Sequence, residues 1–168
     1  YVLDQGIEKV VYLTNTKSGA DYCWYLGASE LYRERLGENA ALEIHMLGRT
    51  YDERAMVYDE MRRLIGLRSA LFFSTDFNAV EAIGYLQRRQ ISIPEDIFVA
   101  GFDDDIYARL CNPRLTSMSV DVSRKAELAV NMLMRLIDGE EVRESEPKID
   151  AVIAERESVM KVEEGLDY

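Results

Sequence analysis

Short runs of apolar residues alternate along this chain with longer segments in which apolar residues recur every three or four positions. The short runs are rich in residues such as Val, Leu and Phe, as in residues 8–13 and 69–74. Continuous runs of this kind are typical of strands that are buried on both faces of a parallel sheet. Strands are predicted at residues 8–13, 41–47, 69–74, 97–102, 115–120 and 149–154.

The longer segments have the period of amphipathic helices. After Asp76, which stands where a helix N-cap is expected, Ala79, Ile83 and Leu86 fall on one stripe. Helices are predicted at residues 18–36, 51–65, 76–90 and 121–138, with a short helical turn at 103–111. This alternation indicates βαβ units and therefore an α/β fold, a Rossmann-like and mostly parallel sheet with helices on both faces.

The charge of the chain narrows the classes of function. Its 168 residues include 31 acidic and 20 basic side chains, which gives a net charge of -11. Nucleic-acid affinity comes mainly from Lys and Arg side chains that displace counterions, so this segment is not expected to bind DNA or RNA by itself. Neither a membrane-spanning run nor a secretory signal is recognisable, so we expect a cytoplasmic protein with no membrane partner. The chain begins with Tyr1 and not with methionine, which suggests a piece of a longer protein.

Residues for metal or nucleophilic chemistry are scarce. Cys23 and Cys111 are the only cysteines and lie far apart, so we expect two reduced, partly buried thiols. The single histidine, His45, lies inside the apolar run 42–47 and is expected to be a strand residue. The sequence has no CxxC, GxGxxG or GxxxxGK[ST] motif, so neither a zinc site nor a common nucleotide fold is supported, and no cofactor is expected.

Polar and aromatic residues gather in the segments that follow four of the predicted strands. Ligands bind beyond the carboxyl ends of the strands in open parallel sheets, so these segments should open on one edge. Their hydroxyls, carboxylates, arginine and aromatic rings suit a small polyhydroxylated molecule. The candidate ligand-binding residues are Tyr22 and Trp24 after the first strand, Arg49 and Tyr51 after the second, Thr75, Asp76 and Phe77 after the third, and Asp103 after the fourth.

Each candidate also has a purely structural interpretation. Asp76 is well placed as a helix N-cap, and Asp103 could cap the turn that follows it. Tyr22 and Trp24 could be core aromatics. The acidic run at residues 103–105 could hold Mg²⁺, but no partner lysine and no phosphate-binding glycine loop supports a metal there.

Residues 69–118 carry an ordered series of short motifs. The pieces are Thr75-Asp76 after an apolar strand, the Ala- and Gly-containing helix segment 79–84, Ile93-Pro94-Glu95-Asp96-Ile97, Gly101-Phe102-Asp103-Asp104 and Pro113-Arg114-Leu115-Thr116-Ser117. In order and spacing this series resembles the C-terminal half of the effector domain of LacI/GalR-type transcription regulators. The flanking segments are similar too, so the resemblance covers about residues 1–159.

The resemblance implies a periplasmic-binding-protein-like fold, in which the chain crosses three times between two Rossmann-like subdomains. The implied division is 1–160 as the C-terminal portion of the effector-binding domain, with 7–116 and 147–160 in the C-terminal subdomain, 1–6 and 119–140 in the N-terminal subdomain, and 161–168 as a tail. The rest of the N-terminal subdomain and a helix-turn-helix headpiece for operator DNA would lie upstream. We therefore expect an exposed apolar face on the N-terminal-subdomain pieces, which would pack elsewhere, swap between chains or lose order.

The resemblance also assigns roles to individual residues. The family's effector lies between the subdomains and changes the affinity for operator DNA. The family's carboxylate at the strand end falls on Asp103, and its polar pair falls on Thr75 and Asp76. An arginine that holds sugars or acids in the family falls on Trp24 if Gly27 is the glycine three residues later. This departure argues for a ligand other than a typical sugar, or for none.

We therefore expect the small-molecule-sensing and dimerising part of a LacI-type regulator, and not an enzyme. The implied homodimer would form through the C-terminal subdomain, with candidate contacts at Tyr107, Leu110 and the helix that contains Tyr85. A fragment of a solute-binding protein of the same fold is the alternative. A small α/β enzyme is a third hypothesis, but the position of His45 in a strand and the missing phosphate loop argue against it.

Overall fold

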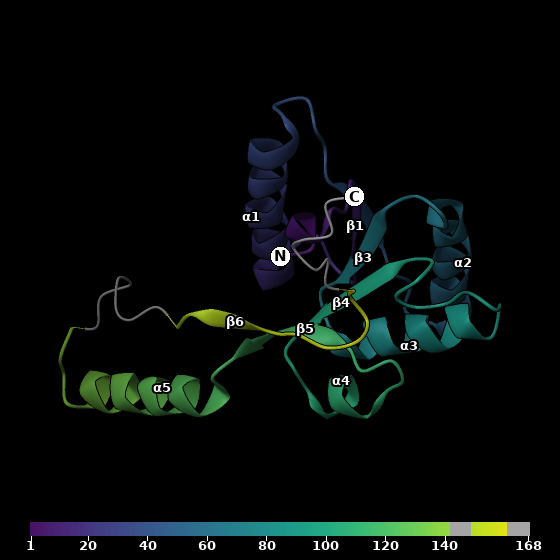
Figure 1. Ribbon diagram of the computed structural model, residues 1–168. Coiled ribbons are helices and arrows are strands. Elements are labelled where there is room, and N and C mark those ends of the chain that lie inside the picture. Colours follow the sequence, from purple (N-terminus) through teal and green to yellow (C-terminus); the bar gives the residue numbers. More distant parts are fainter. Residues whose placement is uncertain (142–148, 161–168) are drawn as a thin grey trace, which may run out of the picture.

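The computed structural model describes residues 1–141 and 149–160 of the chain. At its centre lies a six-stranded sheet with the order β2-β1-β3-β4-β5-β6 (Figure 1). All neighbouring strands are parallel except β5 and β6, which are antiparallel. The strands are β1 (Lys9–Thr14), β2 (Glu43–Met46), β3 (Ser69–Phe73), β4 (Phe98–Phe102), β5 (Thr116–Val120) and β6 (Ala151–Ala154). The prediction of a mostly parallel sheet is confirmed.

The helices follow the predicted order, with ends that differ by a few residues. They are η1 (Leu3–Gln5), α1 (Gly19–Leu36), α2 (Tyr51–Met61), η2 (Arg62–Leu64), α3 (Asp76–Gln87), α4 (Ile106–Leu110) and α5 (Val122–Ile137). At the start of α2 a capping box joins Thr50 and Glu53, which explains why this helix begins where the sequence predicts. The predicted helix 51–65 finishes as the 3-10 turn η2.

The two faces of the sheet are covered differently. On one face, Val11 and Leu13 of β1 pack in the larger apolar cluster, together with residues of α2, α3 and α4 such as Tyr58. On the other face, Val10 and Tyr12 pack with residues of α1 and of the first turn of the chain. This alternation is the period of two that a strand imposes on its side chains. Among the described residues, α1 and the first turn of the chain cover the second face.

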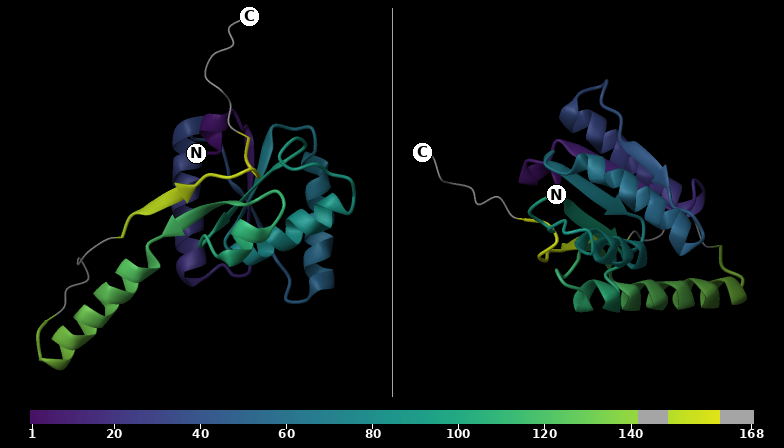
Figure 2. Two further views of the ribbon diagram at one scale, coloured as in Figure 1. Left: turned by 60° about the horizontal axis from the view of Figure 1, so that its bottom comes forward. Right: turned by 90° about the vertical axis from the view of Figure 1, so that its right-hand side faces the viewer.

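Helix α5 projects from the body of the molecule at the end of the β5–β6 ribbon (Figures 1 and 2). None of its residues is buried by the described parts of the chain. Its apolar stripe is largely open, because Val130 is 58% exposed, Leu133 56% and Ile137 67%. The expected exposed apolar face is confirmed. Residues 122–137 nevertheless form a helix, so of the three expected outcomes loss of order is not the one seen in this segment, and packing elsewhere or swapping between chains stays a prediction.

Candidate functional site

The segments after the parallel strands stay together at one edge of the sheet. Backbone hydrogen bonds continue past the strand ends, from the Ser74 amide to the Leu13 carbonyl (3.0 Å) and from the Leu47 amide to the Thr14 carbonyl (2.8 Å). A third bond joins the Asp103 amide to the carbonyl of Met118 (3.0 Å). The sheet thus brings the residues around Thr75 and Asp103 to a common edge, as the strand-end rule predicts.

Asp76 lies at the centre of this edge and braces it. Its side chain is 1% exposed. Its Oδ1 accepts a hydrogen bond from the Ser117 hydroxyl (2.6 Å), and its Oδ2 accepts one from the Asp105 amide (2.9 Å). The prediction that Asp76 is the N-cap is wrong, because Thr75 occupies the N-cap position and Asp76 is the first residue of α3. Its carboxylate connects α3 to β5 and to the loop after β4.

The buried position changes the acidity of Asp76. Burial raises the pKa of this carboxyl from 3.8 to about 6, although the hydrogen bonds from Ser117 and Asp105 favour the charged form. Gly101 allows this close approach, because a Cβ at this position would lie 2.2 Å from Oδ1 of Asp76. Sequence reasoning missed this contact, although the glycine before Phe102 was part of the motif.

Asp103 stands in a strained loop between β4 and α4. Its φ is 108° and that of Asp104 is 52°, a conformation that costs about 1–3 kcal/mol for each residue other than glycine. Partial burial, and then the nearby carboxylate of Asp105, raises the pKa of the Asp103 carboxyl above its ordinary value. Asp103 does not cap the following turn. Asp105 is the N-cap of α4, and its side chain accepts hydrogen bonds from the amides of Tyr107 and Ala108.

Two aromatic candidates on α1 lie on different sides of that helix. Trp24 stacks on Phe102, the residue before Asp103, with ring centroids 3.9 Å apart and an interplanar angle of 20°. Tyr22 stacks instead on Tyr25 (5.8 Å), whose hydroxyl donates to the carbonyl of Leu42 ahead of β2. Positions two apart on an α-helix differ by about 200° in direction. The structure therefore places Trp24 on Phe102, the residue before Asp103, and leaves Tyr22 on the side of α1 that faces β2.

The two hydroxyl groups that follow β3, those of Ser74 and Thr75, differ in their hydrogen bonding. The Thr75 Oγ1 accepts a hydrogen bond from the Asn78 side chain (3.0 Å). The Ser74 hydroxyl is buried and has no hydrogen-bond partner among the described residues. Ser74 is a polar group of this edge that the sequence analysis did not single out, since its position before Thr75 carries no distinctive pattern.

Three further candidates contact residues other than Asp103, although Phe77 directly follows Asp76. Arg49 is exposed, and its carbonyl accepts a hydrogen bond from Arg54 (2.8 Å). The Tyr51 hydroxyl accepts one from Arg88 (2.8 Å), which is the C-cap of α3 and so lies at the opposite end of that helix from Asp76. Phe77 is 55% exposed and meets Tyr107 edge to face, with ring centroids 6.2 Å apart.

The candidate dimer contacts differ in accessibility. Tyr107 is 52% exposed and Leu110 is 75% exposed, so both are available at the surface. Tyr85 is only 4% exposed and packs against the ring of Tyr58 in the core (5.6 Å). The prediction that Tyr85 is a dimer contact is therefore wrong, because its side chain points inward from α3.

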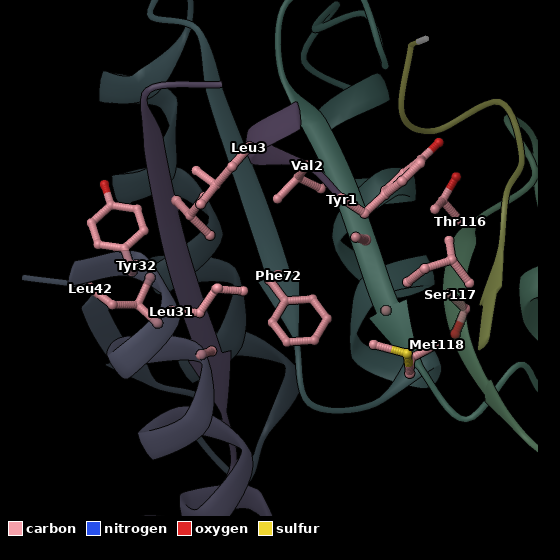
Figure 3. A pocket seen from close by; sticks show the side chains of 15 residues that line it. Tyr1, Val2, Leu3, Leu31, Tyr32, Leu42, Phe72, Thr116, Ser117 and Met118 are labelled. Carbon is pink, nitrogen blue, oxygen red and sulfur yellow. The ribbon is translucent and has the colours of Figure 1, made fainter. Parts of the chain in front are cut away.

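A cavity of about 170 Å³ lies on the α1 face of the sheet, and Asp103 is not among the residues that line it (Figure 3). Most of the residues that line it are apolar, and they come from the first residues of the chain, from α1, from Leu42 and from β1, β3, β4, β5 and β6. Leu3, Leu31 and Phe72 are examples that Figure 3 shows around the opening. An apolar cavity offers few partners for the hydroxyl groups of a polyhydroxylated molecule, so the strand edge is the better candidate for that ligand.

The residues suited to metal or thiol chemistry do not converge. Residues 1–141 and 149–160 contain no group of three or more His, Cys, Asp and Glu side chains that could hold a metal ion. His45 lies on β2 as predicted, and its Nε2 is 2.6 Å from a carboxylate oxygen of Glu43. Cys111 is half-buried, but Cys23 is exposed, so the prediction of partial burial is wrong for Cys23. Among the helices in the described part of the chain, none combines the length and apolar character needed to span a membrane.

Comparisons with known proteins agree on one family. The family model described as "Periplasmic binding protein-like domain" matches residues 1–159. The ribose operon repressor of Escherichia coli is 30% identical over 104 residues, which are 60% of this chain and 32% of the repressor. The chain spans 32%, 42% and 32% of the lengths of three curated relatives it matches, all of them transcriptional regulators.

Solved structures show the same fold. The transcription regulator CcpA of Lactococcus lactis superposes with a TM-score of 0.81 at 19% identity, over 95% of this chain and 58% of CcpA. A periplasmic binding protein/LacI transcriptional regulator from Alkaliphilus metalliredigens, complexed with D-xylulofuranose, has a TM-score of 0.79 at 19% identity, over 95% of this chain and 60% of the other. At these identities the likeness concerns the fold alone.

Proposed function

We propose that this chain is the effector-sensing part of a LacI-type transcriptional regulator. The chain belongs to the periplasmic binding protein-like domain family, in the form that such regulators carry. The effector would be a small polyhydroxylated molecule such as a sugar. The observation that carries this proposal is the stacking of Trp24 on Phe102, which directly precedes Asp103 at the edge of the parallel sheet. The names of the ribose operon repressor and of the D-xylulofuranose complex support the same ligand class.

The chemistry of this edge suits such a ligand. A carboxylate such as that of Asp103 accepts hydrogen bonds from hydroxyl groups, and the face of a ring such as that of Trp24 covers the C–H groups of a sugar. Asp76 has both carboxylate oxygens engaged by protein donors, so in this proposal it shapes the site and does not contact the ligand. Thr75 supplies a hydroxyl beside it.

Titration of the chain with a panel of pentoses and hexoses that includes D-ribose and D-xylulose tests this proposal. Trp24 is the only tryptophan, so its fluorescence reports on the site directly and calorimetry gives the affinity. We expect Asp103→Asn to weaken binding about tenfold or more, because a charged hydrogen bond is lost. Asp52→Asn, at an exposed position in the first turn of α2, is the control. Silence across the whole panel would refute sugar sensing.

The remaining parts of the proposal concern the whole regulator. It would act in the cytoplasm as a homodimer, with Tyr107 and Leu110 at the interface, and would reach operator DNA through a headpiece upstream of this chain. The net charge of -11 supports a division of labour in which another segment contacts the DNA. Measuring whether an effector changes operator binding by the full-length protein tests this. No effect would favour the second candidate, a solute-binding protein of the same fold. The D-xylulofuranose complex supports that alternative, because it is described as a periplasmic binding protein/LacI transcriptional regulator.

A further inference from the structure

The loop that carries Asp103 is held in an unfavourable conformation by contacts from distant parts of the chain. Asp103 and Asp104 have successive positive φ angles of 108° and 52°. The Asp103 amide donates to the Met118 carbonyl (3.0 Å), and the Asp104 amide donates to the Ser117 hydroxyl (3.1 Å). A strained conformation of this kind persists only where the surroundings determine it strongly.

Arg156, two residues after β6, forms a largely buried ion pair with the same loop. Its guanidinium donates to Oδ1 of Asp104, and the two side chains are 14% and 9% exposed. Arg109 binds the other oxygen of the same carboxylate (2.9 Å) but is 58% exposed. Solvent screens an exposed ion pair far more than a buried one, so Arg156 is the more effective partner. Burial by itself would raise the pKa of Asp104, but the hydrogen bonds from Arg156 and Arg109 lower it.

Arg156 is itself fixed in place. Its Nη1 donates to the carbonyl of Leu115 (2.6 Å), immediately before β5. Its backbone amide donates to the Thr116 hydroxyl (2.9 Å), and the same hydroxyl donates to the Arg156 carbonyl (2.9 Å). The guanidinium of Arg156 therefore connects the loop after β4 to the start of β5. Arg156 itself lies after α5 and β6 in the sequence.

We propose that Arg156 is a positioning residue of the effector site, which fixes Asp104 and thereby the orientation of the neighbouring Asp103, the residue after the Phe102 on which Trp24 stacks. This inference rests on the proposed function, because the direction of Asp103 matters to a ligand only if a ligand binds there. It also links the site to the base of the α5 arm, since β5 leads into α5 and Arg156 follows the returning strand β6.

A measurement without ligand tests the positioning. The coupling constants between the amide and α protons of residues 103 and 104 report on φ directly in solution. In Arg156→Met we expect both couplings to move toward motionally averaged values, and Trp24 emission to change because its partner Phe102 adjoins the loop. Arg114→Met is the matched control, because Arg114 forms an exposed pair with Glu157 in the same region. A folded Arg156→Met with wild-type couplings would overturn the proposal.

A second variant covers the case in which Arg156→Met does not fold. Arg156→Lys keeps a positive charge beside Asp104 but cannot donate to Asp104 and to the Leu115 carbonyl through a rigid fork. We expect its couplings to shift in the same direction by a smaller amount. Wild-type couplings in this variant would show that a point charge suffices, which contradicts positioning by the guanidinium.

Binding measurements separate this inference from the proposed function. With D-ribose and D-xylulose as probes, we expect Arg156→Met to weaken calorimetric affinity about tenfold or more, and Arg114→Met to leave it unchanged. An unchanged affinity in Arg156→Met despite altered couplings would refute the positioning role. If the wild-type chain binds neither sugar, the proposed function fails for these ligands, and the coupling constants alone decide whether Arg156 sets the loop.

Discussion

Replacing Asp76 with asparagine should change how the stability of the chain depends on pH. The pKa of the Asp76 carboxyl is raised from 3.8 to about 6 in the folded state, chiefly by burial. The folded state therefore binds this proton more tightly than the unfolded state, and the resulting stability is fully present below about pH 4. It is lost as the pH rises through 6. A shift of about two units corresponds to about 3 kcal/mol at neutral pH.

The assay is urea unfolding of the wild type and of Asp76→Asn at pH values from 4 to 8. Other carboxyls have lowered pKa values, such as Glu43 at about 2, and they contribute stability that is lost at low pH in both proteins. The difference between the two proteins isolates Asp76. Relative to the wild type, Asp76→Asn should gain up to about 3 kcal/mol between pH 4 and 6 and then stay level. A constant offset is added, because the asparagine amide cannot accept the Asp105 hydrogen bond as a carboxylate does.

Ser117→Ala tests whether the hydrogen bond from Ser117 lowers the pKa of the Asp76 carboxyl. It removes the hydroxyl that donates to the charged carboxylate of Asp76, so the pKa should rise further and the loss of stability should extend to higher pH. A difference curve between the wild type and Asp76→Asn that is flat from pH 4 to 8 would refute the reasoning, because Asp76 would then titrate alike in both states.

Three further substitutions test other contacts. Gly101→Ala adds a Cβ 2.2 Å from Oδ1 of Asp76 and should cost about 1–3 kcal/mol in urea unfolding; an unchanged midpoint would contradict the contact. Arg54→Met removes the ion-pair partner of Glu81, which is 17% exposed, and should cost about 3 kcal/mol at neutral pH, of which Arg54→Met/Glu81→Leu should recover part in the same assay. Leu133→Glu, on the exposed stripe of α5, should raise solubility in light scattering and shift the free energy of unfolding by at most about 0.5 kcal/mol; a larger loss would mean that the stripe is covered.

The order of elements could be predicted because local patterns determine it. Continuous apolar runs such as residues 69–74 suit a strand that is covered on both faces, and helical stripes such as the one through Ile83 need one covered face. The direction of β6 could not be predicted, since the apolar pattern of a short strand is the same whether its neighbour is parallel or antiparallel. Only the return of the chain from α5 decides it.

The candidate site could be predicted only in outline. Because the carboxyl ends of parallel strands share one edge, the sequence predicts that Thr75 and Asp103 lie on the same edge. It does not predict in which direction a side chain leaves a helix. Tyr22 and Trp24 are therefore predicted together, although they lie on different sides of α1. An aspartate at the start of a helix has the same sequence pattern whether it caps the helix or braces the sheet. For Asp76 the decision depends on Ser117, 41 residues away, and on the missing Cβ of Gly101.

The sparse burial of α1 has a consequence for the dynamics of the site. Of its 18 residues only Ser29 and Tyr32 are buried, so we expect its amide hydrogens to exchange with solvent through local opening, well before those of β1 and β3. Each opening would carry Trp24 away from Phe102 while the sheet stays intact. A ligand that contacts both the Trp24 and Phe102 rings must keep α1 packed on the sheet. Its binding should therefore slow the exchange of the α1 amide hydrogens, by a factor that increases with affinity.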